Sequence, residues 1–344
     1  MTDVFSRMER LERTLGKKAT ERPPVICPGG MMNAAVVEVM EQGGHTLPEA
    51  HGEGGLIAAL AEDVAMYTGF ENFGLPFCMT VEPEALGASV DYGTLKCEPK
   101  ITRENFPCAR EARYFEKGAI GRSRRGGELL AAIGALRKKH PDVPVIGSLT
   151  GPVSTAASLV GQTAFFRDLY RDRENSHKLI SYVTEQLVDW ALLMAECGAN
   201  VISIADPTAT GEILGPRLFE EYALRYINSI VTAAHGAGKP VIVHICGDIR
   251  AVKKHLFRLE GDALSVDAMV NLEEVKKENS CVTTMGNLST YLLESGDPEK
   301  ISRATGVLLQ KGIDIIAPAC GLSTSSPLAN IQAFTAAVKE ARHG

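Results

Sequence analysis

Eight short runs of apolar, mostly β-branched residues recur along the chain, and each is followed by a stretch with the pattern of a helix. Apolar strands that alternate with helices are typical of a parallel sheet covered by helices on both faces. Eight such units favour a closed (β/α)8 TIM barrel over an open sheet, and no G-x-G-x-x-G phrase follows a strand. The predicted strands are Pro24–Pro28, Gly74–Thr80, Pro144–Gly151, Asn200–Asp206, Pro240–Gly247, Ala263–Ala268, Val282–Leu288 and Asp314–Cys320.

Two segments fall outside this repeat. Val4–Gly16 have the spacing of an amphipathic helix ahead of the first strand, and Glu82–His140 form an insertion between the second and third strands. The insertion is long enough to cap one end of the barrel. We therefore predict a single α/β domain over residues 1–344, namely a TIM barrel with an N-terminal helical extension and one insertion.

Proline and glycine mark where helices should begin and end. Pro216 and Pro298 stand in predicted first turns, where a helix tolerates proline. Gly198, Gly236 and Gly312 follow predicted helix ends, where a left-handed cap is favoured. These signals support helices between the later strands.

Composition identifies an ordinary globular protein and excludes several classes. The chain has 36 Lys and Arg against 42 Asp and Glu, for a net charge of −6, so no basic stripe for nucleic acid is expected. Apolar runs such as PVIVHICG are far shorter than the ~20 residues of a membrane span. The N-terminus lacks the pattern of a secretory signal, so we expect a cytoplasmic protein whose cysteines remain reduced.

The sharpest chemical feature is a histidine and two cysteines at predicted strand ends. His244 and Cys246 are two residues apart on the fifth strand, so their side chains share one face. Cys320 ends the eighth strand, about three βα units further along. Side chains at the carboxyl ends of barrel strands can converge over the barrel mouth, where barrel enzymes keep their sites.

One imidazole and two thiolates with a vacant fourth position form a ligand set suited to catalytic zinc. The alternative is a hydrogen-bonded histidine beside two buried cysteines, which a lone H-x-C phrase would favour. Two such motifs at the same depth of one barrel favour the metal. Zinc held in this way can take up a thiol and deprotonate it, which makes the sulfur a strong nucleophile toward a methyl group.

Four phrases resemble the uroporphyrinogen decarboxylase superfamily and, within it, the methylcobamide:coenzyme M methyltransferase branch. One is the H-x-C of the fifth strand. The others are PFCMTVEPEALG from Pro76, IADPTA from Ile204 and ACGLSTSSPLAN from Ala319. The resemblance covers essentially the whole chain and implies the same (β/α)8 barrel.

The resemblance also implies a ligand set and a methyl donor. His244, Cys246 and Cys320 would bind zinc and act in catalysis, and Asp267 would be a carboxylate that can occupy the fourth position. The methyl group would come from a methylated corrinoid on a separate small corrinoid-binding protein, since the chain has no D-x-H-x-x-G corrinoid-ligand phrase. The acceptor stays open between coenzyme M, another thiol such as homocysteine, and tetrahydrofolate.

Two departures disfavour the decarboxylase branch, which is the alternative enzyme. Alignment on Pro83 and Gly87 puts Cys78 where decarboxylases carry a catalytic Asp, and their R-Q-A-G-R-Y phrase near the first strand is missing. Residues 23–95 contain no Lys or Arg, whereas a substrate with many carboxylates needs cations. A third hypothesis is a non-catalytic relative that binds a corrinoid or a corrinoid protein.

Other polar residues near predicted strand ends are candidates for binding substrate. Asp206 ends the fourth strand and is expected to line the site. His51, together with His45, follows the first strand in GGHTLPEAHGEGG and should lie near the barrel mouth. Either a contact with substrate or a solvated loop position is compatible with these two histidines.

Cys78 is a third candidate for binding substrate. No basic residue lies near it in the sequence, so packing in the core is the favoured alternative. A basic run in the insertion predicts a solvated loop, with contact to an anionic substrate group or to a partner as alternatives. That run consists of Arg122, Arg124 and Arg125.

Overall fold

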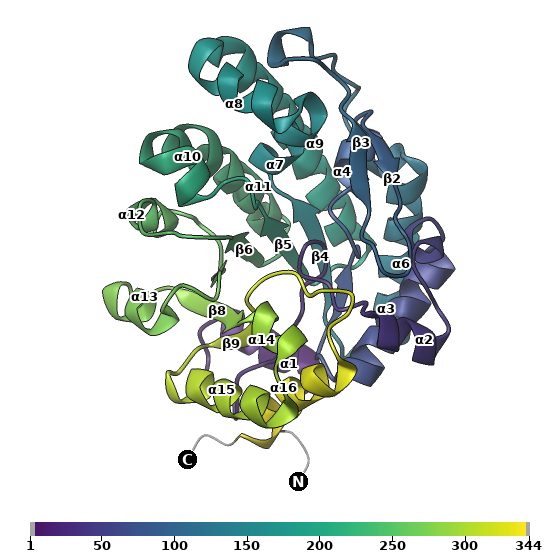
Figure 1. Cartoon of the computed structure of the whole chain (residues 1–344), viewed down its shortest axis with the longest axis vertical. Coiled ribbons are helices and arrows are strands. Elements are labelled where there is room, and N and C mark those ends of the chain that lie inside the picture. The colour runs from purple at the N-terminus through teal and green to yellow at the C-terminus, as the bar shows by residue number, and fades with distance from the viewer. Residues whose placement is uncertain (1–3, 342–344) are drawn as a thin grey trace.

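The computed structural model describes residues 4–341 and contains a curled sheet of seven parallel strands surrounded by helices (Figure 1). The strands are hydrogen-bonded in the order β1-β4-β5-β6-β7-β8-β9, so they follow the chain around the barrel. Their bounds are β1 Phe73–Leu75, β4 Val145–Thr150, β5 Val201–Ala205, β6 Val241–Ile245, β7 Ala263–Val266, β8 Thr283–Leu288 and β9 Ile315–Pro318. These seven fall within or next to seven of the eight predicted runs.

The remaining predicted strand, Pro24–Pro28, lies between β9 and β1 but is not a regular strand. Val25 forms a single parallel bridge to Ile316. The main-chain N–H of Ile26 donates to the carbonyl of Ile316 at 3.0 Å, and the N–H of Ile316 donates to the carbonyl of Pro24 at 2.9 Å. Proline has no N–H for a ladder, so the prolines at both ends of the segment shorten it. The prediction of a complete strand is therefore wrong here, although the segment still closes the barrel.

Helices cover the outside of the sheet, as the alternation predicts. No helix among residues 4–341 is both long and apolar enough to cross a membrane. The helices are α1 Arg7–Leu15, α2 Val37–Gly43, α3 Gly54–Thr68, α4 Val81–Ala85, α5 Ala119–Arg122, α6 Arg124–Lys139, α7 Pro152–Val160, α8 Gln162–Arg171, α9 Arg173–Cys197, α10 Gly211–Leu218, α11 Arg225–Gly236, α12 Lys253–Leu256, α13 Leu272–Glu278, α14 Thr290–Ser295, α15 Pro298–Gln310 and α16 Leu328–Glu340.

The insertion Glu82–His140 holds a small antiparallel pair, β2 (Ser89–Asp91) and β3 (Lys100–Arg103), followed by α5 and α6. The helix α6 packs against α3 in the outer layer of the barrel, so only the part before it is an excursion. The loop between β2 and β3 reaches the segment that follows β9, where Thr324 donates a hydrogen bond to the carbonyl of Lys96 at 2.9 Å. This contact brings the insertion to the barrel mouth.

Most of the predicted helix ends are confirmed. Pro298 begins α15, and Gly198 and Gly312 follow α9 and α15 with φ values of +119° and +66°. Gly236 is an exception, since it is the last residue of α11. Gly238, with φ +69°, makes the turn instead.

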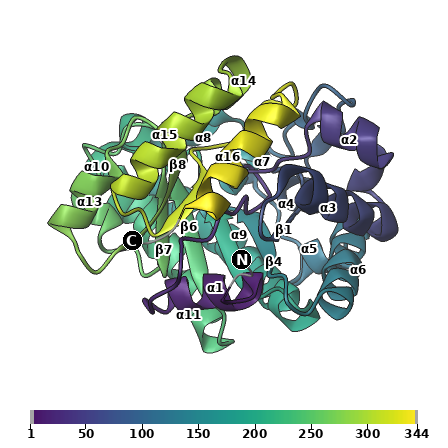
Figure 2. The same ribbon diagram turned by 90° about the horizontal axis from the view of Figure 1, so that it is seen from below.

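The interior of the barrel is a compact apolar cluster, and α1 closes its lower end. Figure 2, which views the barrel from the side, shows α1 and α14 at opposite ends. Leu11 and Leu15 of α1 are buried against the inward side chains near the strand starts. The other members of this cluster are Ile26, Met32, Ile146, Val201, Ile242, Ala263, Met285, Ile315 and Ala317. The helical extension thus leaves the other end, where the strands finish, for the site.

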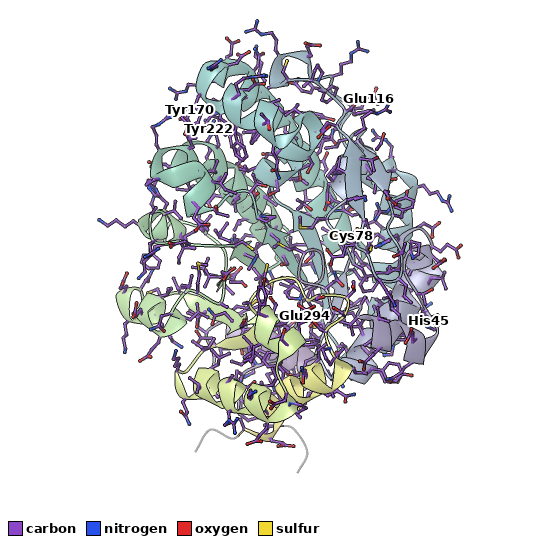
Figure 3. All side chains as sticks on the ribbon, in the orientation of Figure 1. His45, Cys78, Glu116, Tyr170, Tyr222 and Glu294 are labelled. Carbon is purple, nitrogen blue, oxygen red and sulfur yellow. The ribbon has the colours of Figure 1, made fainter. Side chains whose placement is uncertain are left out.

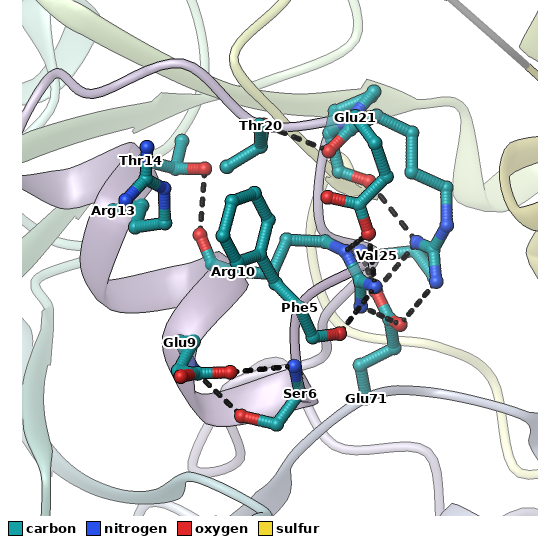
Figure 4. Close-up of polar contacts among 12 residues, drawn as sticks. Phe5, Ser6, Glu9, Arg10, Arg13, Thr14, Thr20, Glu21, Val25 and Glu71 are labelled. Carbon is teal, nitrogen blue, oxygen red and sulfur yellow. Dashed lines mark hydrogen bonds and ion pairs between the residues drawn. The ribbon is translucent and has the colours of Figure 1, made fainter. Parts of the chain in front are cut away.

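A buried carboxylate ties α1 to the closing segment (Figure 4). Glu71 is 2% exposed and accepts hydrogen bonds from Arg10 at 2.8 Å, from Arg22 at 2.7 and 2.9 Å, and from the main chain of Val25 at 3.0 Å. Buried charges are tolerated when they are paired and hydrogen-bonded in this way. The group therefore anchors the segment that completes the barrel.

Replacement of Glu71 by alanine should lower the free energy of unfolding by about 3–5 kcal/mol, because two buried guanidinium groups lose this carboxylate, while Arg10 keeps its contact with Glu21. Trp190 is the only tryptophan and is fully buried, so its fluorescence can follow unfolding in urea. Glu299→Ala is the matched control, since Glu299 is exposed and pairs with the exposed Arg303. A Glu71→Ala midpoint equal to that of Glu299→Ala would contradict the anchoring role.

Candidate functional site

Two strand ends bring the predicted histidine and cysteines together at the barrel mouth. His244 lies on β6, Cys246 directly follows β6, and Cys320 stands two residues after β9. The Nε2 atom of His244 is 3.0 Å from Cys246 Sγ, and the two sulfur atoms are 3.3 Å apart. The ligand atoms of the three residues all lie within 4.8 Å of one another. The convergence expected from the two motifs is therefore present.

The imidazole is oriented from behind by a serine. His244 is fully buried, and its Nδ1 atom lies 2.9 Å from the hydroxyl of Ser265, which is paired with it across β6 and β7. Such a contact to the second ring nitrogen of a metal-binding histidine holds the ring in place. Ser265 was not among the predicted site residues, although its place two residues before Asp267 on the same strand puts both on one face.

A hydrogen bond links the two thiols. It lowers the pKa of Cys320, with a further contribution from His244, and it raises the pKa of Cys246 together with burial. Two neighbouring thiolates repel each other and are stabilised by a cation between them, and a coordinated thiol is deprotonated. Two sulfur atoms and one nitrogen form a donor set that fits zinc.

Asp267 directly follows β7 and is partly exposed. Its Oδ1 atom accepts a hydrogen bond from the main chain of Met269 at 3.2 Å, and its charge helps to raise the pKa of Cys246. The carboxylate is near the three ligands but is not one of the group within 4.8 Å. Its role as a fourth ligand stays a prediction.

Asp206 directly follows β5 and is fully buried. Its carboxylate accepts hydrogen bonds from the main chains of Val153 and Ser154 at 3.0 and 2.9 Å and from the Ser154 hydroxyl at 2.6 Å. Burial raises the pKa of Asp206 to about 6. The carboxylate therefore caps the N-terminus of α7, and contact with substrate stays a prediction.

A buried arginine lies beside Cys78, contrary to the sequence-based expectation. Arg125 is 6% exposed, and its Nη2 donates to Cys78 Sγ at 3.0 Å. Its other groups donate to Glu84 at 2.7 Å and to the carbonyl of His51 at 3.1 Å. The solvated loop predicted for the basic run is wrong at this residue, because the first turn of α6 packs over the end of β1. Its two neighbours in the run are exposed.

The two histidines of the loop after the first predicted strand have different environments. His51 is 5% exposed, and burial, followed by the charge of Arg125, lowers its pKa to about 4, so the ring is neutral. His45 instead contacts Asp63 at 2.7 Å and lies at the outer edge beside α2 and α3 (Figure 3). The expectation that His45 lies at the barrel mouth is wrong. A role for His51 in binding substrate stays a prediction.

Sequence reasoning missed two acidic residues near the mouth. Glu82 is 1% exposed and accepts two hydrogen bonds from Thr150, each at 3.2 Å, while burial raises its pKa to about 7. Glu98 lies in the loop between β2 and β3, where partial desolvation raises its pKa and Asn33 is a hydrogen-bond partner. The position of Glu82 just after a predicted strand end was a signal, whereas nothing in the sequence marked Glu98.

A cavity of about 610 Å³ adjoins Cys320, one of the three candidate ligands. Cys320 and Cys78 both line it, so it extends from the metal-ligand set to the end of β1. Its remaining lining residues are Gly30, Met31, Asn33, Met79, Glu98, Pro99, Thr290, Tyr291, Glu294, Gly321, Leu322, Ser323 and Thr324. A small molecule bound there would touch a metal ligand directly.

Comparison with known proteins agrees with this arrangement. The family model of uroporphyrinogen decarboxylase (URO-D) matches residues 6–341. The chain is 31% identical over 341 residues to methylcobamide:CoM methyltransferase MtbA of Methanosarcina acetivorans, covering 98% of this chain and 99% of that one. It is 30% identical over 340 residues to methylcobamide:CoM methyltransferase MtaA of Methanosarcina barkeri, with 98% of each chain covered.

A solved structure supports the same relationship. A methyltransferase from Methanosarcina mazei superimposes with a TM-score of 0.90 at 29% identity, covering 98% of this chain and 99% of that one. These findings confirm the resemblance to the methyltransferase branch and the predicted barrel. The chain therefore belongs to the uroporphyrinogen decarboxylase family.

Proposed function

We propose that this chain is a zinc-dependent methyltransferase that moves a methyl group from a methylated corrinoid to a small acceptor in the cytoplasm. The observation that carries the proposal is the set of His244, Cys246 and Cys320, whose ligand atoms meet within 4.8 Å at the barrel mouth. Full-length similarity to methylcobamide:CoM methyltransferases supports the same reaction class. The corrinoid would arrive on a separate small protein.

Each residue of the site has a defined task in this proposal. When bound, zinc would supply Lewis-acid chemistry that favours the deprotonated form of an acceptor thiol. Ser265 holds the His244 ring so that Nε2 faces the sulfur atoms. His244, Cys246 and Cys320 would hold the metal, since their ligand atoms already meet within 4.8 Å. The cavity beside Cys320 would bind the acceptor next to one of these ligands.

Two alternatives are less well supported. A porphyrinogen decarboxylase would need cations around its substrate, whereas Arg125, which is buried beside Cys78, is already paired with Glu84. A non-catalytic relative that binds a corrinoid protein has no need for a set of metal ligands. Zinc content and turnover therefore separate these hypotheses.

Purified protein should contain about one zinc per chain, and Cys246→Ser or Cys320→Ser should lose both zinc and activity, because the metal needs both thiolates. Metal analysis measures the first, and methyl transfer from methylcobalamin to coenzyme M, homocysteine or tetrahydrofolate measures the second. Cys281→Ser is the control, since Cys281 is exposed and outside the site. Full zinc occupancy in the Cys246→Ser, Cys320→Ser double variant would contradict the assignment of these two cysteines as zinc ligands.

Uroporphyrinogen should be neither decarboxylated nor tightly bound. The position expected for a catalytic Asp holds Cys78, and the cavity beside Cys320 is lined by Glu98 and Glu294, which repel a polycarboxylate. Coproporphyrinogen formation, followed by chromatography and compared with heat-inactivated protein, checks this expectation. A rate above that background would favour the decarboxylase.

If the acceptor is a thiol, it should replace Asp267 or a water at the fourth zinc position. X-ray absorption at the zinc edge should then show that the zinc gains one sulfur neighbour at about 2.3 Å and loses one light-atom neighbour. Asp267→Ala should retain zinc, since three protein ligands remain, with weaker affinity. An unchanged zinc environment in the presence of an active thiol would exclude direct coordination and favour tetrahydrofolate.

A further inference from the structure

The cavity beside Cys320 has an acidic wall, contributed by two elements that are distant in sequence. Glu98 comes from the insertion, and Glu294 comes from α14, which follows β8. Glu294 and Cys78, which are both labelled in Figure 3, line this cavity together. Cys320, a candidate metal ligand, lines the same cavity as Glu98 and Glu294, so this negative charge lies beside the candidate metal site.

The nearest cations do not neutralise this wall. Arg125 lies behind Cys78 and is paired with Glu84 at 2.7 Å. Lys96 and Lys100 flank Glu98 in sequence, but neither is among the residues that line the cavity. Both are exposed, and Lys100 lies 3.8 Å from Asp91. Among the described residues, those lining the cavity include two carboxylates and no Lys, Arg or His.

Binding of an acceptor thiolate adds to the negative charge at this place. A divalent metal held by one neutral imidazole and two thiolates has a net charge near zero, so a third thiolate leaves the centre negative. An acceptor with an anionic far end would bring a second negative charge toward Glu98 and Glu294. A cationic far end would instead be attracted to both carboxylates.

We propose that Glu98 and Glu294 select the acceptor by charge, favouring a thiol whose far end is cationic and disfavouring a sulfonate or a carboxylate. This inference rests on the proposed methyl transfer to a thiol. It assigns Glu98 and Glu294 as specificity-determining residues, because both line the cavity that Cys320 also lines. It also predicts that this chain uses a thiol of different charge from coenzyme M, the molecule in the names of its relatives.

Three thiols with the same two-carbon arm test the proposal, namely thiocholine, 2-mercaptoethanol and 2-mercaptoethanesulfonate. Their far ends are cationic, neutral and anionic, and the quaternary ammonium of thiocholine cannot bind a metal. We expect kcat/KM with methylcobalamin to be about tenfold higher or more for thiocholine than for the sulfonate, after subtraction of the reaction without protein. Glu98→Gln should reduce this ratio several-fold. Because the comparison is a ratio of ratios, intrinsic differences in thiol reactivity cancel.

Two further variants make the experiment decisive. Glu294→Gln tests the second carboxylate independently and should reduce the ratio in the same direction. Glu299→Gln is the matched control, since Glu299 lies on α15 outside the cavity, and it should leave the ratio unchanged. Zinc content and the thermal unfolding midpoint confirm that each variant is folded. A preference for the sulfonate, or a ratio that neither Glu98→Gln nor Glu294→Gln alters, would overturn the proposal.

A binding measurement separates this inference from the proposed function. Calorimetry on the zinc-loaded protein without a methyl donor should give tighter binding for thiocholine than for the sulfonate, and Glu98→Gln should reduce the difference. If no thiol is methylated but this binding order holds, the methyl-transfer proposal fails and charge selection stands. If thiols are methylated without the binding order, charge selection fails and the methyltransferase stands.

Discussion

Closure of the barrel between β9 and β1 is the constraint on which the site depends. Pro24–Pro28 fill this gap with one bridge at Val25 rather than a full ladder, and Glu71 holds the main chain of Val25 from outside. Cys320 follows β9, and Cys78 follows β1. Without closure, these residues would stand at opposite edges of an open sheet, and the cavity that both line would not exist. A buried ion-pair group far from the chemistry therefore determines whether the cavity forms.

The candidate metal centre is positioned by regular strands, so the separations between its ligand atoms are fixed by the sheet. His244 and Cys246 are two residues apart along β6, and Cys320 reaches them from β9 across the barrel mouth. The partner strand β7 supplies Ser265 at the position paired with His244. Rigid strands hold ligand atoms at fixed separations before a metal arrives, which lowers the cost of organising the site.

The insertion supplies the charges around this rigid centre. The first turn of α6 brings Arg125 to Cys78, and the loop between β2 and β3 brings Glu98 to the cavity. In barrel enzymes the framework holds the reacting groups while the connecting loops vary the chemistry. In this chain the candidate metal ligands stand at strand ends of the framework, and the carboxylates that line the adjoining cavity come from a loop and from α14.

Sequence alone predicted the barrel and the convergence of the three candidate metal ligands, His244, Cys246 and Cys320. The sequence carries a repeating pattern in which apolar runs alternate with helices, and this pattern predicts a parallel barrel. Residues at the carboxyl ends of its strands then meet at the barrel mouth. Tertiary structure alone decided which other polar groups join them. Arg125 is 47 residues from Cys78 and pairs with it only because α6 packs over the end of β1. Asp206 follows a strand end as expected, yet both oxygens of its carboxylate accept hydrogen bonds from the first turn of α7. Glu98 of the loop between β2 and β3 and Glu294 of α14 line one cavity although 196 residues separate them, and no local pattern encodes such a meeting.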